Sequence, residues 1–195
     1  MELGRCKEAL ESHERAIALQ PGYAEAWSDR GNTLARLKHH EPALESYGQA
    51  IALRPDYATA HLNRALCTLL LGDYASGWGE YEWRWQDERR EKYRRDFAQP
   101  LWLGAQHLQG KTILLHSDQG LGDTLHFCRY AQLVAASGAK VILEVQPELL
   151  PLLAGLQGVA PALAKGSALP PFDFHCPLLA RADCLYAGAI RNAAD

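Results

Sequence analysis

The sequence predicts helical hairpin repeats followed by a parallel α/β sheet. The first half repeats itself: residues 9–27 and 43–61, offset by 34, are identical at 12 of 19 positions. From residue 111 onward, short apolar runs alternate with segments of helical periodicity, which is typical of parallel strands joined by helices. The chain has 195 residues and is 48% hydrophobic, enough to bury a core, and its net charge of −3 indicates no general attraction to nucleic acid or membranes.

The repeat half predicts five helices. In 43–53, apolar side chains recur at i, i+1, i+4, i+7 and i+8, which places them on one helical face. Pro21 and Pro55 each follow such a face and end the helix, because proline offers no N–H and disfavours helix just before it. The expected helices cover residues 7–19, 24–37, 42–53, 58–71 and 74–86. The first has no partner before it, so the chain is expected to start inside a repeat.

The period and the joint A-I-A-L-x-P-x-Y-A-x-A resemble the tetratricopeptide repeat. Such repeats imply a protein partner held in a groove lined by the first helix of each pair. Asp29 and Asn63, which lie 34 apart, are expected to face that groove. In the similar repeats of O-linked N-acetylglucosamine transferases, an asparagine at this position grips the partner's backbone; Asn63 matches it and Asp29 does not. The alternative is that both are solvated polar residues on a short scaffold.

An aromatic and then a charged segment separate the two halves. In 77–85, GWGEYEWRW, the rings of Trp78, Tyr81 and Trp85 share one helical face and are interpreted as packing residues. Residues 87–99 mix acids and bases evenly, which favours a solvated linker over a nucleic-acid site. The predicted domains are therefore the repeats at 1–86, the linker at 87–99 and an α/β domain at 100–195.

The second half predicts an incomplete Rossmann-like domain. Apolar runs at 111–117, 139–146, 158–166 and 172–179 are expected as strands, with helices at 122–138 and 147–156. Alternating strands and helices favour parallel pairing through crossovers. The alternation ends after residue 179, so only the first part of a larger fold is expected.

The loop at 119–123 leaves the carboxyl end of the first predicted strand, the edge at which parallel sheets bind ligands. The start of the following helix favours an anion there. The dinucleotide fingerprint G-x-G-x-x-G is only half present, because Gly120 and Gly122 fit but Leu125 replaces the third glycine. No P-loop lysine follows, so a nucleotide-phosphate loop is not expected.

Longer motifs resemble bacterial proteins that fuse tetratricopeptide repeats to a heptosyltransferase-like glycosyltransferase domain. They are YEWRW, PLWLG, HSDQGLGDTLHFCRYAQLVAASGAKVILEVQPELLPLL and PPFDFHCPLL. The resemblance implies two facing Rossmann-like lobes, with Asp123 as the general base toward an acceptor hydroxyl. It also implies an acceptor loop formed by Gln119, Gly120, Gly122 and Thr124. The alternative for Asp123 is a helix cap.

The resemblance ends before the lobe that would hold a nucleotide-sugar donor. The expectation is a glycosyltransferase-like protein, N-terminal part only and inactive by itself, with protein-binding repeats. The alternative is a non-catalytic protein-interaction module. Uncovered strand edges and helix faces also favour self-association.

No metal or cofactor site is expected. His116, His126 and His175 lack the spaced partners of a metal site. The five cysteines, at 6, 67, 128, 176 and 184, form no CxxC pair and are interpreted as free thiols of a cytoplasmic protein. The sequence shows neither an N-terminal signal pattern nor an apolar run of the ~20 residues that span a bilayer.

Overall fold

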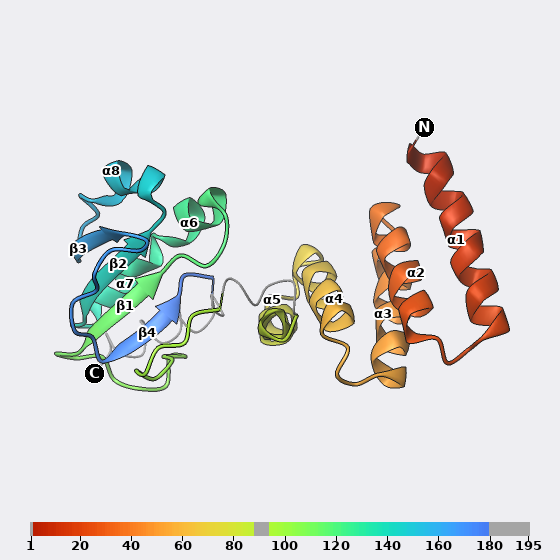
Figure 1. Ribbon diagram of the computed structural model, residues 1–195, viewed down its shortest axis with the longest axis horizontal. Coiled ribbons are helices and arrows are strands. Elements are labelled where there is room, and N and C mark those ends of the chain that lie inside the picture. Colours follow the sequence, from red (N-terminus) through yellow and green to blue (C-terminus); the bar gives the residue numbers. More distant parts are fainter. Residues whose placement is uncertain (1, 88–93, 180–195) are drawn as a thin grey trace. The chain divides into compact units, whose positions relative to one another are not determined.

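The computed structural model describes residues 2–87 and 94–179 and divides the chain into two compact units, Met1–Glu91 and Lys92–Asp195. The first is a series of helical hairpins and the second contains a four-stranded parallel sheet (Figure 1). The predicted fold class is confirmed. Part of the predicted linker (88–93), the segment 180–195 and the fifth cysteine, Cys184, lie outside the described residues.

The repeat unit contains the five predicted helices. They are α1 (Glu2–Leu19), α2 (Ala24–Arg36), α3 (His40–Leu53), α4 (Ala58–Leu70) and α5 (Tyr74–Tyr81), and each packs against the next along the chain. The fifth is shorter than expected, because residues Glu82–Trp85 continue it as a 3₁₀ turn, η1. Asp73 caps α5 by accepting a hydrogen bond from the N–H of Ser76 (3.1 Å).

Small residues bring the repeat helices close together. Ala43, Ala50, Ala60 and Ala65 have no exposed surface. At Gly31 the approach is closest, because a Cβ there would lie 2.5 Å from Cε1 of the buried Tyr47 ring. Hydrogen at this position is therefore what allows α3 to pack on α2.

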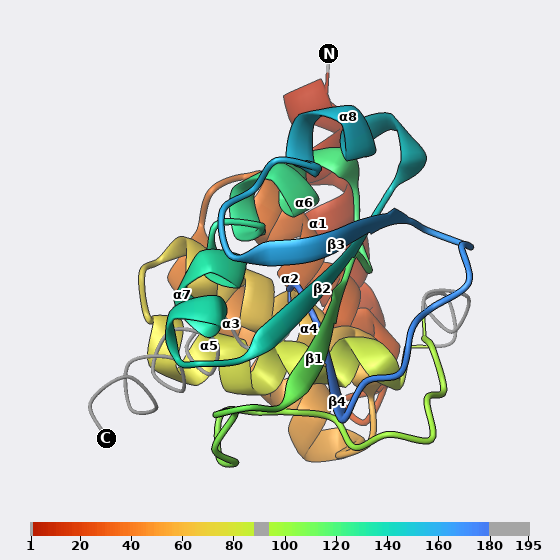
Figure 2. The same cartoon turned by 90° about the vertical axis from the view of Figure 1, so that its left-hand side faces the viewer.

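The sheet of the second unit has the strand order β3-β2-β1-β4, all parallel. Its strands are β1 (Thr112–His116), β2 (Lys140–Val145), β3 (Val159–Ala164) and β4 (Phe174–Pro177). Figure 2 shows them side by side. The register places His116 of β1 opposite Glu144 of β2, and Leu114 of β1 opposite His175 of β4. Polar side chains of three strands thus share one face near the carboxyl edge.

The helices of this unit are short. The single helix expected at 122–138 is two helices, α6 (Leu121–Phe127) and α7 (Tyr130–Ala136), and α7 packs against β2 and β3. A tight turn separates them, in which the N–H of Ala131 bonds to the carbonyl of Cys128 (3.0 Å). The helix expected at 147–156 is a 3₁₀ turn, η3 (Pro147–Leu149), followed by α8 (Leu150–Leu153).

The segment before β1 covers the outer edge of β4. Leu101 pairs with His175, and the N–H of Trp102 bonds to the carbonyl of His175 (2.9 Å). Trp102 is fully buried and its indole N–H bonds to the carbonyl of Gln106 (2.9 Å). The strand edge that the sequence left uncovered is therefore partly paired.

Candidate functional site

A groove of about 370 Å³ lies over the first helices of the two hairpins, α2 and α4. Its polar part is a chain of side chains that joins the helices. Nδ2 of Asn63 donates to Oδ1 of Asn32 (2.8 Å), and the hydroxyl of Tyr47 donates to the same oxygen (3.0 Å). Beside it lie two exposed leucines of α4, Leu66 and Leu70. The groove thus places amide groups next to an apolar strip.

The two residues predicted to face this groove are joined by a third. Asp29 accepts a hydrogen bond from Nδ2 of Asn32 (3.4 Å), and Asn32 in turn bonds to Asn63. Asn63 lines the groove, whereas Asp29 is an exposed neighbour. Asn32 was not found from the sequence, because the residue 34 positions later is Leu66 and the repeat gives no matching amide.

Asp123 occupies the third position of α6 and reaches back to its start. Its Oδ2 accepts the N–H of Gly120 (3.2 Å), and the carboxylate is exposed. The side chain therefore stabilises the helix start in the manner of a capping box, and does not bond forward as a residue at the N-cap would. An exposed, fixed carboxylate at the carboxyl edge of the sheet is compatible with a role as a base.

The other residues of the predicted acceptor loop are either exposed at the surface or hold the loop in place. Gly120 and Gly122 are exposed, but Thr124 is buried, with its hydroxyl 3.3 Å from the carbonyl of Gly120. The carbonyl of Gln119 accepts a hydrogen bond from Nε2 of Gln146, at the end of β2 (2.8 Å). This bond fixes the loop to the neighbouring strand, and Gln146 was not identified from the sequence.

A buried polar cluster lies on one face of the sheet below this loop. Nε2 of His116 lies 3.3 Å from Nδ1 of His175, and Arg95 forms an ion pair with the fully buried Glu144. The ring of Phe97 contacts both histidines, with ring centroids 5.4 and 4.8 Å apart. Arg95 and Phe97 fall within the predicted linker, yet they pack on the sheet.

Burial controls the protonation of the histidines in this cluster. Burial first, and then the neighbouring His175, Arg95 and Lys165, together lower the pKa of His116 to about 3. Burial and Arg95 also lower the pKa of His175. Both rings are therefore neutral at pH 7, as expected for core histidines.

Several buried polar atoms near the carboxyl edge have no hydrogen-bond partner within the described residues: His116 Nδ1, Ser117 Oγ, Glu144 Oε1 and Gln146 Oε1. Such atoms are normally paired, since an unpaired buried polar group costs about 1–3 kcal/mol. They lie at the ends of β1 and β2, next to the loop that carries Asp123. Water or a hydroxyl-bearing ligand would satisfy them.

Neither a metal centre nor a membrane span is visible in the described part of the chain. There, no three His, Cys, Asp or Glu side chains are grouped to hold a metal ion. Nor is any described helix both long and apolar enough to cross a bilayer. Cys128 and Cys176 are buried thiols, and burial raises the pKa of Cys128.

The helical hairpins have a counterpart among known families. Residues 24–57 match the tetratricopeptide repeat. This match contains α2, α3 and the turn that leads into α4. Tetratricopeptide repeats indicate a protein-interaction module.

Among solved structures, the chain is similar to a mutant O-GlcNAc transferase of Thermobaculum terrenum, with 15% identity and a TM-score of 0.40. The match covers 74% of this chain and 36% of that chain, so the chain corresponds to about a third of that protein's length. No curated protein matches the sequence.

Proposed function

We propose that the chain is a protein-binding scaffold whose tetratricopeptide repeats hold an extended peptide in the groove of α2 and α4. The supporting observation is the joined pair Asn32 and Asn63 beside Leu66 and Leu70. Side-chain amides offer both donors and acceptors to a peptide backbone, and the leucines offer an apolar surface to its side chains.

The test is selection of linear peptides from a display library on the whole chain, followed by affinity measurements. Leu66→Glu places a charge on the apolar strip without disturbing the core, because Leu66 is 45% exposed. We expect this variant to weaken the selected peptides by tenfold or more. Leu133→Glu, on the exposed side of α7, is the matched control and should leave affinity unchanged. If the selected peptides bind Leu66→Glu with the same affinity as the original chain, the proposed peptide-binding role of the groove is refuted.

We also infer that the α/β unit is the acceptor-side half of a sugar-transfer site and that it is inactive without a donor lobe. The support is the exposed carboxylate of Asp123 on a loop fixed by Gln146, next to unpaired buried polar atoms. In such a reaction Asp123 would accept the proton of the acceptor hydroxyl as the sugar–phosphate bond breaks. The competing view is that this unit only supports the repeats.

Nuclear magnetic resonance titration separates these two views. With N-acetylglucosamine as the probe, we expect shifts at the backbone amides of Gly120 and Asp123. The same titration with a panel of nucleotide sugars should show no additional binding through the diphosphate. Asp123→Asn keeps an acceptor for the Gly120 N–H, so this variant should fold. The shifts that the sugar causes in the backbone amide signals of the loop should nevertheless change in it. Unchanged amide signals at high sugar concentration would favour the purely supporting role.

A further inference from the structure

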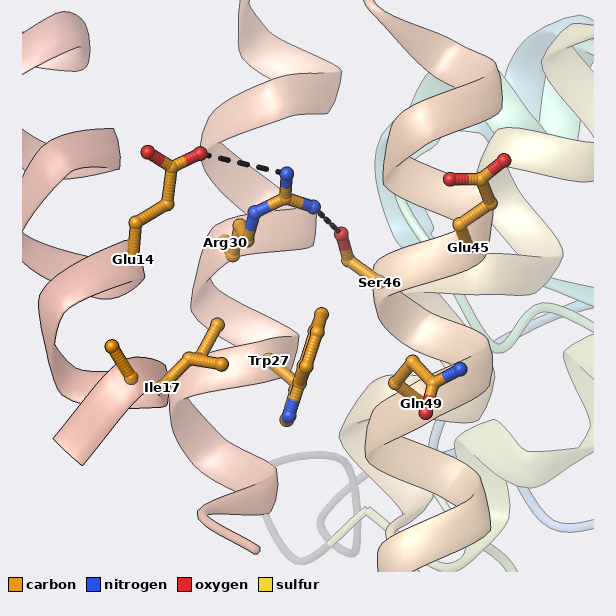
Figure 3. A pocket seen from close by; sticks show the side chains of 8 residues that line it. Glu14, Ile17, Trp27, Arg30, Glu45, Ser46 and Gln49 are labelled. Carbon is orange, nitrogen blue, oxygen red and sulfur yellow. Dashed lines mark hydrogen bonds and ion pairs between the residues drawn. The ribbon is translucent and has the colours of Figure 1, made fainter. Parts of the chain in front are cut away.

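A second hollow, of about 520 Å³, lies in the repeat unit on the side away from the groove residues, between α1 and α3. Figure 3 shows Trp27 and Arg30 of α2 facing it, with Glu14 of α1 on one side and Glu45 of α3 on the other. The family match and the proposed groove do not account for it. Its size is within the range of ligand pockets.

In the next repeat, the equivalent position is occupied by a side chain of the chain itself. Thirty-four residues after Trp27 stands His61, whose ring nitrogen bonds to the carbonyl of Pro55 (2.9 Å). Trp27 makes the equivalent bond to the carbonyl of Pro21 (3.0 Å), so the two rings are held in the same way. The ring of His61 is covered by Trp83, which stacks on it in parallel with centroids 3.9 Å apart.

In the first repeat the covering ring is missing. The position that corresponds to Trp83 is Gln49, a shorter and exposed side chain that lines the hollow. No ring contact on Trp27 from α3 occurs among the described residues, and its nearest cation is Arg30, 6.0 Å from the ring centroid. A planar group of a ligand could therefore stack on the uncovered face of Trp27, as Trp83 stacks on His61.

The arginine of each repeat is already satisfied. Arg64 forms two hydrogen bonds with Glu80 through its Nε (both 2.9 Å). The equivalent Arg30 donates to Ser46 (2.7 Å) and pairs with Glu14 (3.5 Å). A carboxylate ligand would have to displace Glu14 from Arg30, so the hollow does not favour an anion.

The charged side chains that line the hollow have a net negative charge. Glu45 is exposed and has no ion pair with any residue in the described ranges. Glu14 and Glu45 together carry two negative charges against the one positive charge of Arg30. A planar cation fits this arrangement, since the lining offers it the ring of Trp27 for stacking and the carboxylate of Glu45 for charge pairing.

We propose that this hollow binds the guanidinium of an arginine on a partner protein. Guanidinium is the planar side-chain group that stays charged at pH 7 and above, unlike imidazolium, whereas a lysine ammonium is a point charge that cannot replace a stacked ring. The arginine lies on the exposed face of Trp27 and forms a salt bridge with Glu45. Two faces of the repeat unit then contact partners, the groove through amides and leucines and this hollow through a cation.

The test is a titration of the whole ¹⁵N-labelled chain with acetyl-Gly-Arg-Gly-amide, followed at the indole N–H signal of Trp27. The signal is assigned by its loss in Trp27→Phe. We expect a saturable shift and roughly tenfold weaker binding of the citrulline peptide, which is planar but neutral. The lysine peptide should also bind more weakly than the arginine peptide. Equal shifts with citrulline and arginine would overturn the proposal.

Two pairs of variants test the geometry. Glu45→Gln should weaken binding of the arginine peptide by about two- to fivefold. Glu11→Gln, which changes an exposed acid of α1 outside the hollow, should not weaken it.

Gln49→Trp introduces the ring that the next repeat has and should abolish binding of the arginine peptide, while Gln132→Trp on α7 should leave that binding intact. Leu66→Glu, which blocks the groove, should have no effect here, so the two binding sites fail independently. Full binding by Gln49→Trp would refute the proposed site.

Discussion

Acidification should destabilise the α/β unit because its core holds neutral histidines. His116 is 2% exposed, and burial lowers its pKa to about 3, far below the value of about 6.5 for an exposed imidazole. The unfolded chain therefore binds a proton near pH 6.5 that the folded chain excludes. The stability contributed by the neutral ring is present above pH 6.5 and is lost as the pH falls toward 3.

The magnitude follows from the proton count. Well below pH 6.5, one excluded proton lowers the free energy of unfolding by about 1.4 kcal/mol per pH unit, which amounts to about 2 kcal/mol between pH 6.5 and 4.5. His175, whose pKa is also lowered by burial and by Arg95, adds to this slope. Arg95, Lys165 and Glu144 are the other charged groups around the pair, and Arg95 and Lys165 disfavour a charged ring.

The assay is urea unfolding at several pH values, with 5-fluorotryptophan in place of tryptophan. Of the five tryptophans, Trp102 lies in the α/β unit and the other four lie in the repeat unit, so ¹⁹F signals report each unit separately. His116→Asn should reduce the acid slope of the Trp102 transition, and His39→Asn in the repeat unit should leave it unchanged. A Trp102 transition independent of pH between 6.5 and 4.5 would refute the reasoning.

Three further predictions concern the repeat unit. Glu80→Ala leaves the partly buried Arg64 without its carboxylate and should lower the free energy of unfolding of this unit by about 2 kcal/mol, measured by urea unfolding. Gly31→Ala should cost about 1–3 kcal/mol because the added Cβ meets the Tyr47 ring. Gly48→Ala, with nothing within 4 Å of its Cβ, should instead stabilise α3 by about 0.5–1 kcal/mol; a loss of stability there would contradict the packing argument.

The order and type of the elements could be predicted because they depend on local patterns. The 34-residue offset and the two prolines place α2, α3 and α4 to within two residues of their ends. Breaks inside helices could not be predicted. The apolar pattern runs through Cys128 without a glycine or proline, so the turn between α6 and α7 has no sequence signal.

The candidate sites depend on contacts between distant residues, and these follow no period. Arg95 pairs with Glu144, which lies 49 positions later in the sequence. The arginine belongs to the charged stretch that the sequence predicts to be a solvated linker. Asp123 was found through its motif, but the bond of Gln146 that fixes its loop depends on the strand register. Motifs indicate which residues carry chemistry, whereas supporting residues become visible only in the fold.

Repeats offer one further source of information, in the positions at which they differ. Identical residues such as Pro21 and Pro55 maintain the shared fold and say little about ligands. The change from Trp83 to Gln49 removes a ring at a site whose other parts are retained, including the bond from the underlying ring to a carbonyl. The ring of Trp27 is therefore held in place but left uncovered, which is the arrangement that a stacking ligand requires.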